Sequence, residues 1–195
     1  MFSTSPLPME SVKCINTCSN AFYFEVETTE KDVAEDAFKK STKRSSHWVR
    51  SEDNKYLLLN PEEQFQAQNL TQLTDSMKFQ IQAYKDLTCS VGREGRSVML
   101  YMKNGGENKV VCCDPNHRIY PKEMETLPVD IGSTKHPALF YMSQLTRCNA
   151  FEFESSFYPS EFLGFEPDSN NPSLYKLVLH KKERNDDRVD AIFLM

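Results

Sequence analysis

The side chains that could act as catalysts in this chain are few and far apart in the sequence. Ser155 and Ser156 follow Glu154 and could form a nucleophile beside a carboxylate, but no histidine is tied to that corner by sequence. Hydroxyls in such a corner more often cap the local backbone. We therefore expect no catalytic residue here. The same expectation holds for the remaining classes of catalytic motif, because the chain has no Gly-x-Ser-x-Gly, phosphate-binding or dinucleotide-binding sequence.

The histidines and cysteines do not have the spacing of a metal or redox site. No two histidines are close in sequence, and no Cys-x-x-Cys pair occurs. Cys112 and Cys113 are adjacent, and strand alternation predicts that one lies in the core and the other on the surface. We expect reduced thiols, no metal, no cofactor and no enzyme activity. The histidines of the chain are His47, His117, His136 and His180, and its cysteines are Cys14, Cys18, Cys89, Cys112, Cys113 and Cys148.

Charge divides the chain into an acidic head and a neutral body. Residues 1–36 carry the whole net charge of −5. The stretch Lys39, Lys40, Lys43 and Arg44 could contact nucleic acid, but it has no interleaved aromatic residues, so we expect no nucleic-acid partner. The N-terminus resembles no signal peptide, and no apolar run could span a membrane. We expect synthesis in the cytosol and no membrane partner.

Short alternating segments with turn signals between them predict an all-β sandwich or barrel. A strand is predicted at Ala21–Val26, and the polar stretch from residue 27 to residue 46 is predicted to be an exposed linker. The β domain should therefore cover roughly residues 45–195. Its predicted strands are His47–Arg50, Tyr56–Asn60, Gln64–Gln68, Met77–Tyr84, Arg96–Met102, Lys109–Asp114, Arg118–Tyr120, Ala138–Ser143, Phe151–Ser155, Phe162–Glu166, Leu174–His180 and Asp190–Leu194.

One block in the C-terminal half resembles a family signature. Phe153, Glu154, Ser155 and Ser156 form a corner between two apolar segments, and Phe162-Leu163 follows after Pro159. This arrangement resembles the signature of the interleukin-1 cytokine family. Further matching pieces are Tyr84-Lys85-Asp86, Tyr120 to Met124, and Leu174 to Leu179.

The resemblance implies a β-trefoil barrel of about twelve short strands. It also implies that the protein is made as a precursor. Residues 1–36 would be an acidic propeptide and residues 37–195 the mature cytokine domain. Family precursors are cut after Asp by an inflammatory, caspase-1-like protease. Asp36, followed by the small Ala37, matches that site, and the charge boundary falls at the same bond. Asp32 is a poorer candidate because Val33 follows it.

The resemblance also implies partners. Family members are secreted by a leaderless route and signal through a receptor of two chains, alpha and beta, and a soluble binding protein is a further expected partner. The matching receptor-binding residues are Lys40, Arg44, Arg50 and Asp53, while Ser173 stands where the family has an acidic contact. We expect a monomer with pro-inflammatory activity.

Two alternatives remain open from the sequence. One is a cytokine of the same family that uses a different receptor pair. The other is a β-trefoil protease inhibitor or sugar-binding module. Inhibitors and lectins of that shape normally have a leader, and the inhibitors also have disulfides, and this sequence shows signs of neither.

Overall fold

The computed structural model describes residues 11–18, 21–27, 37–88, 95–146, 149–182 and 191–195. The chain divides into two compact units, Met1–Glu35 and Asp36–Met195. The division into propeptide and mature domain concerns processing and stays a prediction.

The first unit contains an antiparallel hairpin of β1 (Ser11–Cys18) and β2 (Ala21–Glu27). Its register runs from the pair Ser11 and Glu27 to the pair Cys18 and Ala21, with a bulge between Cys14 and Asn16. The strand predicted at Ala21–Val26 is confirmed. Its partner β1 was not predicted, because the bulge interrupts the alternation from which a strand is recognised.

The second unit is built almost entirely of strands, so the prediction of an all-β fold is confirmed. One short 3-10 helix, η1 (Asp75–Met77), stands among them, and no helix of the described residues is long and apolar enough to cross a membrane. The strands are β3 (Phe38–His47), β4 (Val49–Arg50), β5 (Tyr56–Leu59), β6 (Phe65–Gln68), β7 (Phe79–Asp86), β8 (Arg96–Asn104), β9 (Glu107–Cys113), β10 (Ile119–Met124), β11 (Asp130–Ile131), β12 (Phe140–Gln144), β13 (Phe151–Ser155), β14 (Glu161–Pro167), β15 (Tyr175–Lys181) and β16 (Phe193–Leu194).

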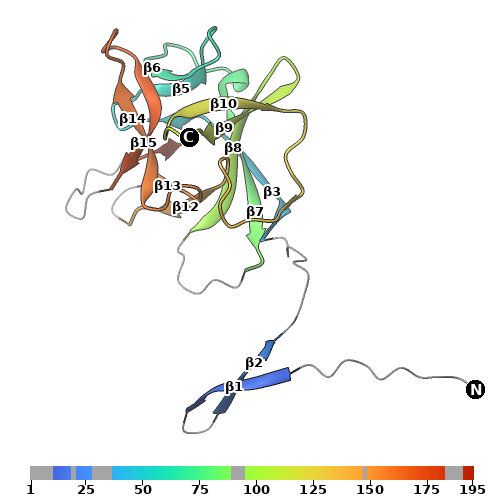
Figure 1. The fold of residues 1–195 in the computed structure, drawn as a ribbon. Coiled ribbons are helices and arrows are strands. Elements are labelled where there is room, and N and C mark those ends of the chain that lie inside the picture. The colour runs from blue at the N-terminus through green and yellow to red at the C-terminus, as the bar shows by residue number, and fades with distance from the viewer. Residues whose placement is uncertain (1–10, 19–20, 28–36, 89–94, 147–148, 183–190) are drawn as a thin grey trace, which may run out of the picture. The chain divides into compact units, whose positions relative to one another are not determined.

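The strands of the second unit close into a barrel to which hairpins are attached (Figure 1). The neighbouring barrel strands are β3, β7, β8, β12 and β13. The last strand closes the barrel: Ile192 exchanges two backbone hydrogen bonds with Phe151, and β16 pairs with β4. The attached hairpins are β5–β6, β9–β10 and β14–β15.

The turn between β8 and β9 shows how sequence fixes the register of a hairpin. Asn104 pairs with Glu107, so the loop is two residues long. Gly105 and Gly106 have φ angles of 60° and 94°, which residues other than glycine rarely adopt. Two positive φ angles in a two-residue loop match the right-handed twist of the strands, so these glycines define the turn.

The second unit contains two hydrophobic clusters, and β9 lies between them. Val111 and Cys113 belong to one cluster, and Val110 and Cys112 belong to the other. The prediction that one of the two adjacent cysteines is on the surface is therefore wrong, because both faces of β9 are covered. Cys112 and Cys113 are 0% and 3% exposed.

The prediction of an exposed linker up to residue 46 is wrong at its C-terminal end. Residues 38–47 form β3, which pairs with β7 on one side and with β11 on the other. Phe38 is completely buried in the second cluster and fixes the start of the strand. The polar composition of β3 concealed it, because a strand whose side chains are mostly exposed has no apolar alternation.

Candidate functional site

The corner after β13 is organised by two buried serine hydroxyls. Ser155 Oγ accepts hydrogen bonds from the backbone N–H groups of Phe157 and Tyr158, at 3.2 and 3.1 Å. Ser156 Oγ donates to the carbonyl of His136 at 3.0 Å and accepts from its N–H at 3.1 Å. Both hydroxyls therefore hold backbone in place, as predicted from the sequence.

No general base is aimed at either hydroxyl among the residues around this corner. Cys113 Sγ lies 3.7 Å from Ser155 Oγ, and burial raises the pKa of its thiol to about 11. His136 accepts a hydrogen bond from the N–H of Ala138 through Nδ1, and burial lowers its pKa. The corner has the chemistry of a structural turn.

The other signature residues support the same corner. Phe153 and Leu163 are completely buried in the core. Glu154 Oε1 accepts the N–H of Ser160 at 2.8 Å, and Phe162 is half-buried beneath the ammonium of Lys182, 5.2 Å from the ring centroid. The signature block therefore marks how the chain folds, and the candidate binding residues lie elsewhere.

Two of the candidate receptor-binding residues, Lys40 and Arg44, lie on β3. The Lys40 N–H donates to the Val129 carbonyl at 2.7 Å, and its side chain is half-buried, whereas that of Arg44 is exposed. A bulge separates them, because Lys40 pairs with Tyr84 while Arg44 pairs with Gln82. Both cations therefore lie on backbone that pairs with β7, and the backbone of Lys40 is also held by Val129 on the other side.

The other two candidates, Arg50 and Asp53, lie at the turn between β4 and β5. The Arg50 guanidinium donates to the side-chain oxygen of Asn54 and stacks over Phe193, 4.6 Å from the ring centroid. Asp53 is exposed and accepts a 2.8 Å hydrogen bond from the hydroxyl of Tyr175, which raises the pKa of that hydroxyl. The structure thus brings together Arg50 and Asp53 in one turn, and Lys40 and Arg44 on one strand.

The predicted cleavage site, between Asp36 and Ala37, lies just before the start of β3 at Phe38. Asp36 lies outside the described residues. Ala37 is buried, and its carbonyl accepts a 2.9 Å hydrogen bond from the N–H of Leu87. A protease must bind several residues in extended form, so cutting at this bond requires the first residues of β3 to separate from the domain.

Metal-ligating side chains do not gather anywhere in the described part of the chain. Within it, no group of three or more His, Cys, Asp or Glu residues could hold an ion. Two such side chains do meet at His117, whose Nδ1 lies 2.8 Å from Glu161 Oε2. The imidazole ring of His117 also stacks on the ring of Tyr158, with 3.9 Å between the ring centroids.

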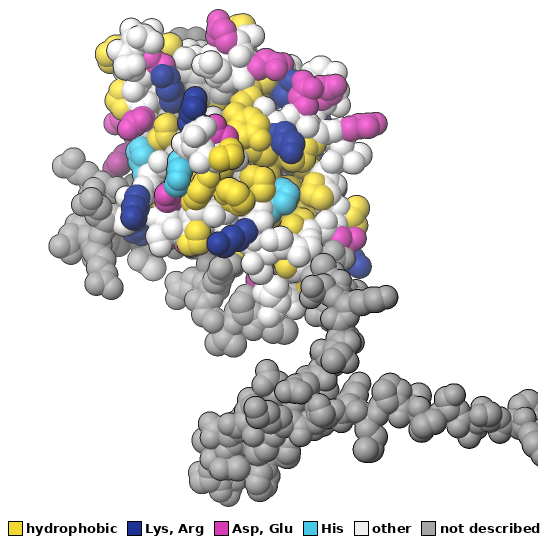
Figure 2. Space-filling view, viewed as in Figure 1, with side chains coloured by type: hydrophobic (Ala, Val, Ile, Leu, Met, Phe, Trp, Pro, Cys, Tyr) yellow, Lys and Arg dark blue, Asp and Glu magenta, His cyan; other side chains and the backbone are white. Residues whose placement is uncertain are grey.

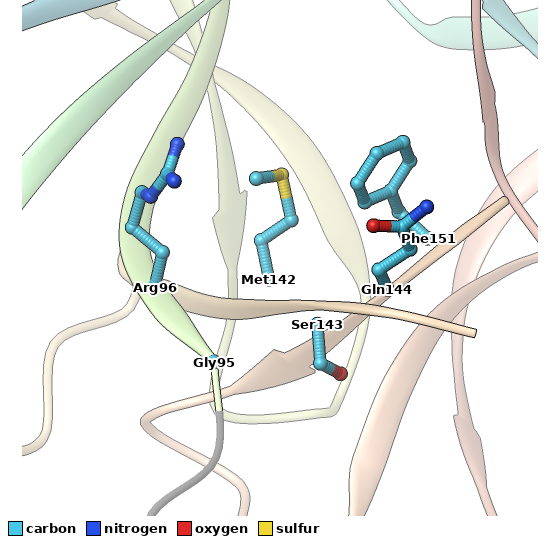
Figure 3. Close-up of a pocket in the computed structure, with 6 residues that line it drawn as sticks. All are labelled: Gly95, Arg96, Met142, Ser143, Gln144 and Phe151. Carbon is cyan, nitrogen blue, oxygen red and sulfur yellow. The ribbon is translucent and has the colours of Figure 1, made fainter. Parts of the chain in front are cut away.

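A shallow pocket of about 480 Å³ opens beside the ends of β8, β12 and β13. Figure 3 shows the side chains of Arg96, Met142, Gln144 and Phe151 pointing to the same side, with Ser143 pointing away. The lining combines one cation and one amide with two apolar side chains. The hydroxyl of Ser143, which also lines the pocket, donates to Glu152 Oε1 at 3.0 Å, and no histidine lines the pocket, so the lining is better suited to binding than to catalysis.

Hydrophobic side chains gather near the middle of the face shown in Figure 2, in the region of β9 and β10. Tyr120 on β10 is 38% exposed. Apolar surface bordered by charged residues is typical of protein interfaces. The surface of the second unit thus offers charged and apolar groups for a protein partner.

A closed barrel with three attached hairpins defines the class of this domain as a β-trefoil. The solved structures it resembles include chicken interleukin-1 beta, with a TM-score of 0.57 and 19% identity over 81% of this chain and 99% of that chain. A hydrophobic-cavity mutant of chicken interleukin-1 gives a TM-score of 0.59 and 18% identity over the same shares of the two chains. The predicted fold is confirmed.

Among curated proteins, the chain is similar to rat interleukin-18, with 30% identity over 94 residues. The matched part is 48% of this chain and 45% of the rat protein, so it spans less than half the length of that relative. A scan against protein-family models found no match. The similarity to rat interleukin-18 agrees with the predicted resemblance to the interleukin-1 family, and the solved structures agree with the fold. Both relatives are cytokines, in agreement with the expectation that the chain is not an enzyme.

Proposed function

We propose that this protein is the precursor of a pro-inflammatory cytokine of the interleukin-18 type. The observation that carries the proposal is the agreement of two independent likenesses, in sequence to interleukin-18 and in fold to interleukin-1 beta. The sequence pieces Tyr84-Lys85-Asp86 and Tyr120 to Met124 also resemble interleukin-18 more than interleukin-1 itself. The cytokine acts by binding the alpha and beta chains of an interleukin-18-type receptor, and it stimulates responses of the interferon-gamma type.

Receptor binding is assigned to Lys40, Arg44, Arg50 and Asp53. Three observations support this choice: the β3 pair and the β4–β5 pair are each held on paired strands, Arg44 and Asp53 are exposed, and none of the four is required by the hydrophobic clusters. Charged groups on a rigid surface steer association and fix orientation between proteins. A soluble binding protein would use the same surface.

Release is assigned to a caspase-1-like protease that cuts between Asp36 and Ala37. The burial of Ala37 makes this step depend on local opening of the first residues of β3, an event that low-stability strand ends undergo readily. The precursor is then cytoplasmic, and the cut protein is secreted by a leaderless route and acts as a monomer.

The test uses reporter cells that carry both interleukin-18-type receptor chains. Protein cut by an inflammatory caspase should activate the reporter, and uncut protein should not. Arg50→Gln combined with Asp53→Asn should reduce activation, whereas a matched surface change, Lys135→Gln with Asp75→Asn, should leave it unchanged. A silent reporter with correctly folded, cut protein would overturn the proposal.

The same assay separates the alternatives. An interleukin-1 beta-like cytokine would activate cells with the interleukin-1 receptor pair instead. A β-trefoil inhibitor would be silent on both cell types and would slow a protease.

A further inference from the structure

Strand β3 carries a regular arrangement of cations that the fold does not need. Lys39-Lys40 and Lys43-Arg44 form two doublets separated by Ser41 and Thr42, and no acidic residue occurs between Phe38 and Arg50. Clusters of Lys and Arg over so short a stretch are typical of patches that bind nucleic acid or heparin. The side chains around these cations in the fold indicate which of the two polyanions they would bind.

Several other lysines of the domain are held in ion pairs, whereas, within the described part of the chain, these four cations are not. The ion pairs include Lys109 with Glu63 at 2.7 Å, Lys176 with Asp168 at 2.9 Å, and Lys182 with Glu152 at 3.0 Å. No ion pair joins any of the four β3 cations to a residue that the structure describes. Their charge is available to an external anion.

A bulge in β3 lies within the stretch that carries the cations. Side chains alternate along a regular strand, so one member of each doublet would normally point inward. Between Lys40 and Arg44 the register shifts, and Gln82 Nε2 holds the bulge by donating to the carbonyls of Ser41 at 2.6 Å and Lys43 at 3.2 Å. Lys43 and Arg44 are both exposed, as are the neighbouring Thr42, Ser45 and Ser46.

A fifth cation joins the patch from the neighbouring strand. Lys85 on β7 lies directly opposite Lys39, and both are exposed. Like charges directly opposite each other destabilise a sheet. Asp130 is the partner of Lys39 on its other side, in β11, and Asp86 lies opposite Phe38, so two carboxylates lie beside these cations. An external anion at Lys39 and Lys85 would relieve their repulsion.

We propose that this β3 patch binds a sulfated polysaccharide of the heparin type. The patch consists of Lys39, Lys40, Lys43, Arg44 and Lys85, with Lys39 to Arg44 extending over about 15 Å of strand. A linear polysulfate needs point charges spaced along a rigid line, and the paired strand supplies them. This inference does not rest on the proposed cytokine activity.

The surroundings of the patch favour a sulfated sugar over single-stranded nucleic acid. Nucleic-acid surfaces of this kind combine cations with aromatic side chains on which bases stack. Here Tyr84 is buried with its hydroxyl bound to the Pro128 carbonyl, and Trp48 is covered by the ammonium of Lys78, 4.1 Å from the ring centroid. Among the described residues near β3, these rings are therefore not free to stack on bases.

The experiment compares two triple variants of the full chain on immobilised heparin. The patch variant is Lys39→Gln with Lys43→Gln and Lys85→Gln, which leaves the proposed receptor contacts Lys40 and Arg44 in place. The control is Lys103→Gln with Lys135→Gln and Lys181→Gln, which removes the same charge from exposed lysines elsewhere. The patch variant should bind about tenfold more weakly near physiological salt, with a shallower salt dependence, while the control binds as the wild type does.

Three outcomes would overturn the proposal. If both variants weaken equally, or if the full chain does not bind heparin at all, the β3 patch is not a polysaccharide site. If single-stranded DNA binds as tightly as heparin and with the same loss in the patch variant, the partner class is wrong. Reporter activation by the caspase-cut patch variant should persist, which separates failure of this inference from failure of the proposed function.

Discussion

At the scale of single residues, the hydroxyl of Ser155 stabilises the backbone of the corner after β13. This hydroxyl is buried and accepts two backbone N–H groups. Ser155→Ala would leave both donors without their partner, and an unsatisfied buried group costs about 1–3 kcal/mol. We expect the free energy of unfolding in urea to fall by about that amount. Ser173→Ala, at an exposed position, should change it by no more than about 0.5 kcal/mol.

The two buried cysteines give a second prediction at this scale. Burial raises the pKa of Cys112 to about 12 and that of Cys113 to about 11, so neither is a thiolate near neutral pH. The thiolate is the form that reacts with alkylating agents. In native protein at mildly alkaline pH, peptide mass spectrometry should find both unmodified by iodoacetamide, with full modification in urea. Alkylation of either one in the folded protein would contradict the burial of both faces of β9.

The raised pKa values of these two thiols also make the free energy of unfolding depend on pH. In the unfolded chain these thiols ionise near the ordinary value of 9.0, whereas in the fold they keep their protons to about 11 or 12. The folded state therefore binds more protons above pH 9, and its stability must fall as pH rises. Unfolding in urea should be independent of these two groups below pH 8 and should become easier between pH 9 and 11. Replacing both cysteines with Ala should flatten that decline.

At the scale of elements, the apolar pattern predicted most strands that bury apolar side chains and missed most of β3, whose side chains are mostly exposed. The predicted Phe151–Ser155 coincides with β13, and most other predictions differ from the observed strands by one to three residues. Most of β3 was missed because its pairing is encoded in β7, which is far away in sequence. The prediction for Cys112 and Cys113 failed for a related reason, since the second cluster gathers side chains from strands and loops that are far apart in sequence, which no local pattern reveals. The grouping of Lys85 with the β3 cations likewise depends on sheet register and not on sequence.

The bulge in β3 should depend on Gln82. In Gln82→Met the side chain keeps its length and loses its amide, so the carbonyls of Ser41 and Lys43 lose a donor. We expect amide hydrogens in residues 41–44 to exchange faster, while those of β14 and β15 stay unchanged. The loss of stability should be about 1 kcal/mol. Unchanged exchange in the bulge would mean that the backbone alone maintains it.

The junction at the start of β3 is tested by paired substitutions. Asp36→Ala should abolish release of the mature domain by an inflammatory caspase, because such proteases require Asp at the cut bond. Asp32→Ala should be cut at the normal rate. Mass spectrometry of the products checks both, and a new N-terminus anywhere other than Ala37 would contradict the assignment. The unfolding free energy of Asp36→Ala should match the wild type within about 0.5 kcal/mol.

At the scale of the whole molecule, the core of the domain is contained within one unit. Both hydrophobic clusters are formed by residues from Ala37 to Leu194, and the barrel is closed by the C-terminal strand. A chain starting at Ala37 should therefore fold by itself. Its circular dichroism should show β structure, and its thermal midpoint should lie within a few degrees of that of the full chain.

Truncation from the other end provides the contrast. Ile192 is 1% exposed, exchanges two hydrogen bonds with Phe151, and precedes the pairing of β16 with β4. A chain ending at residue 190 would leave the barrel open and expose one side of the first cluster. Deleting a buried Ile side chain alone costs about 2–5 kcal/mol, and the lost strand adds to this, which is comparable with the whole stability of a domain of this size. We expect no cooperative thermal transition in that variant, and a normal melting curve would show that the barrel does not depend on its last strand.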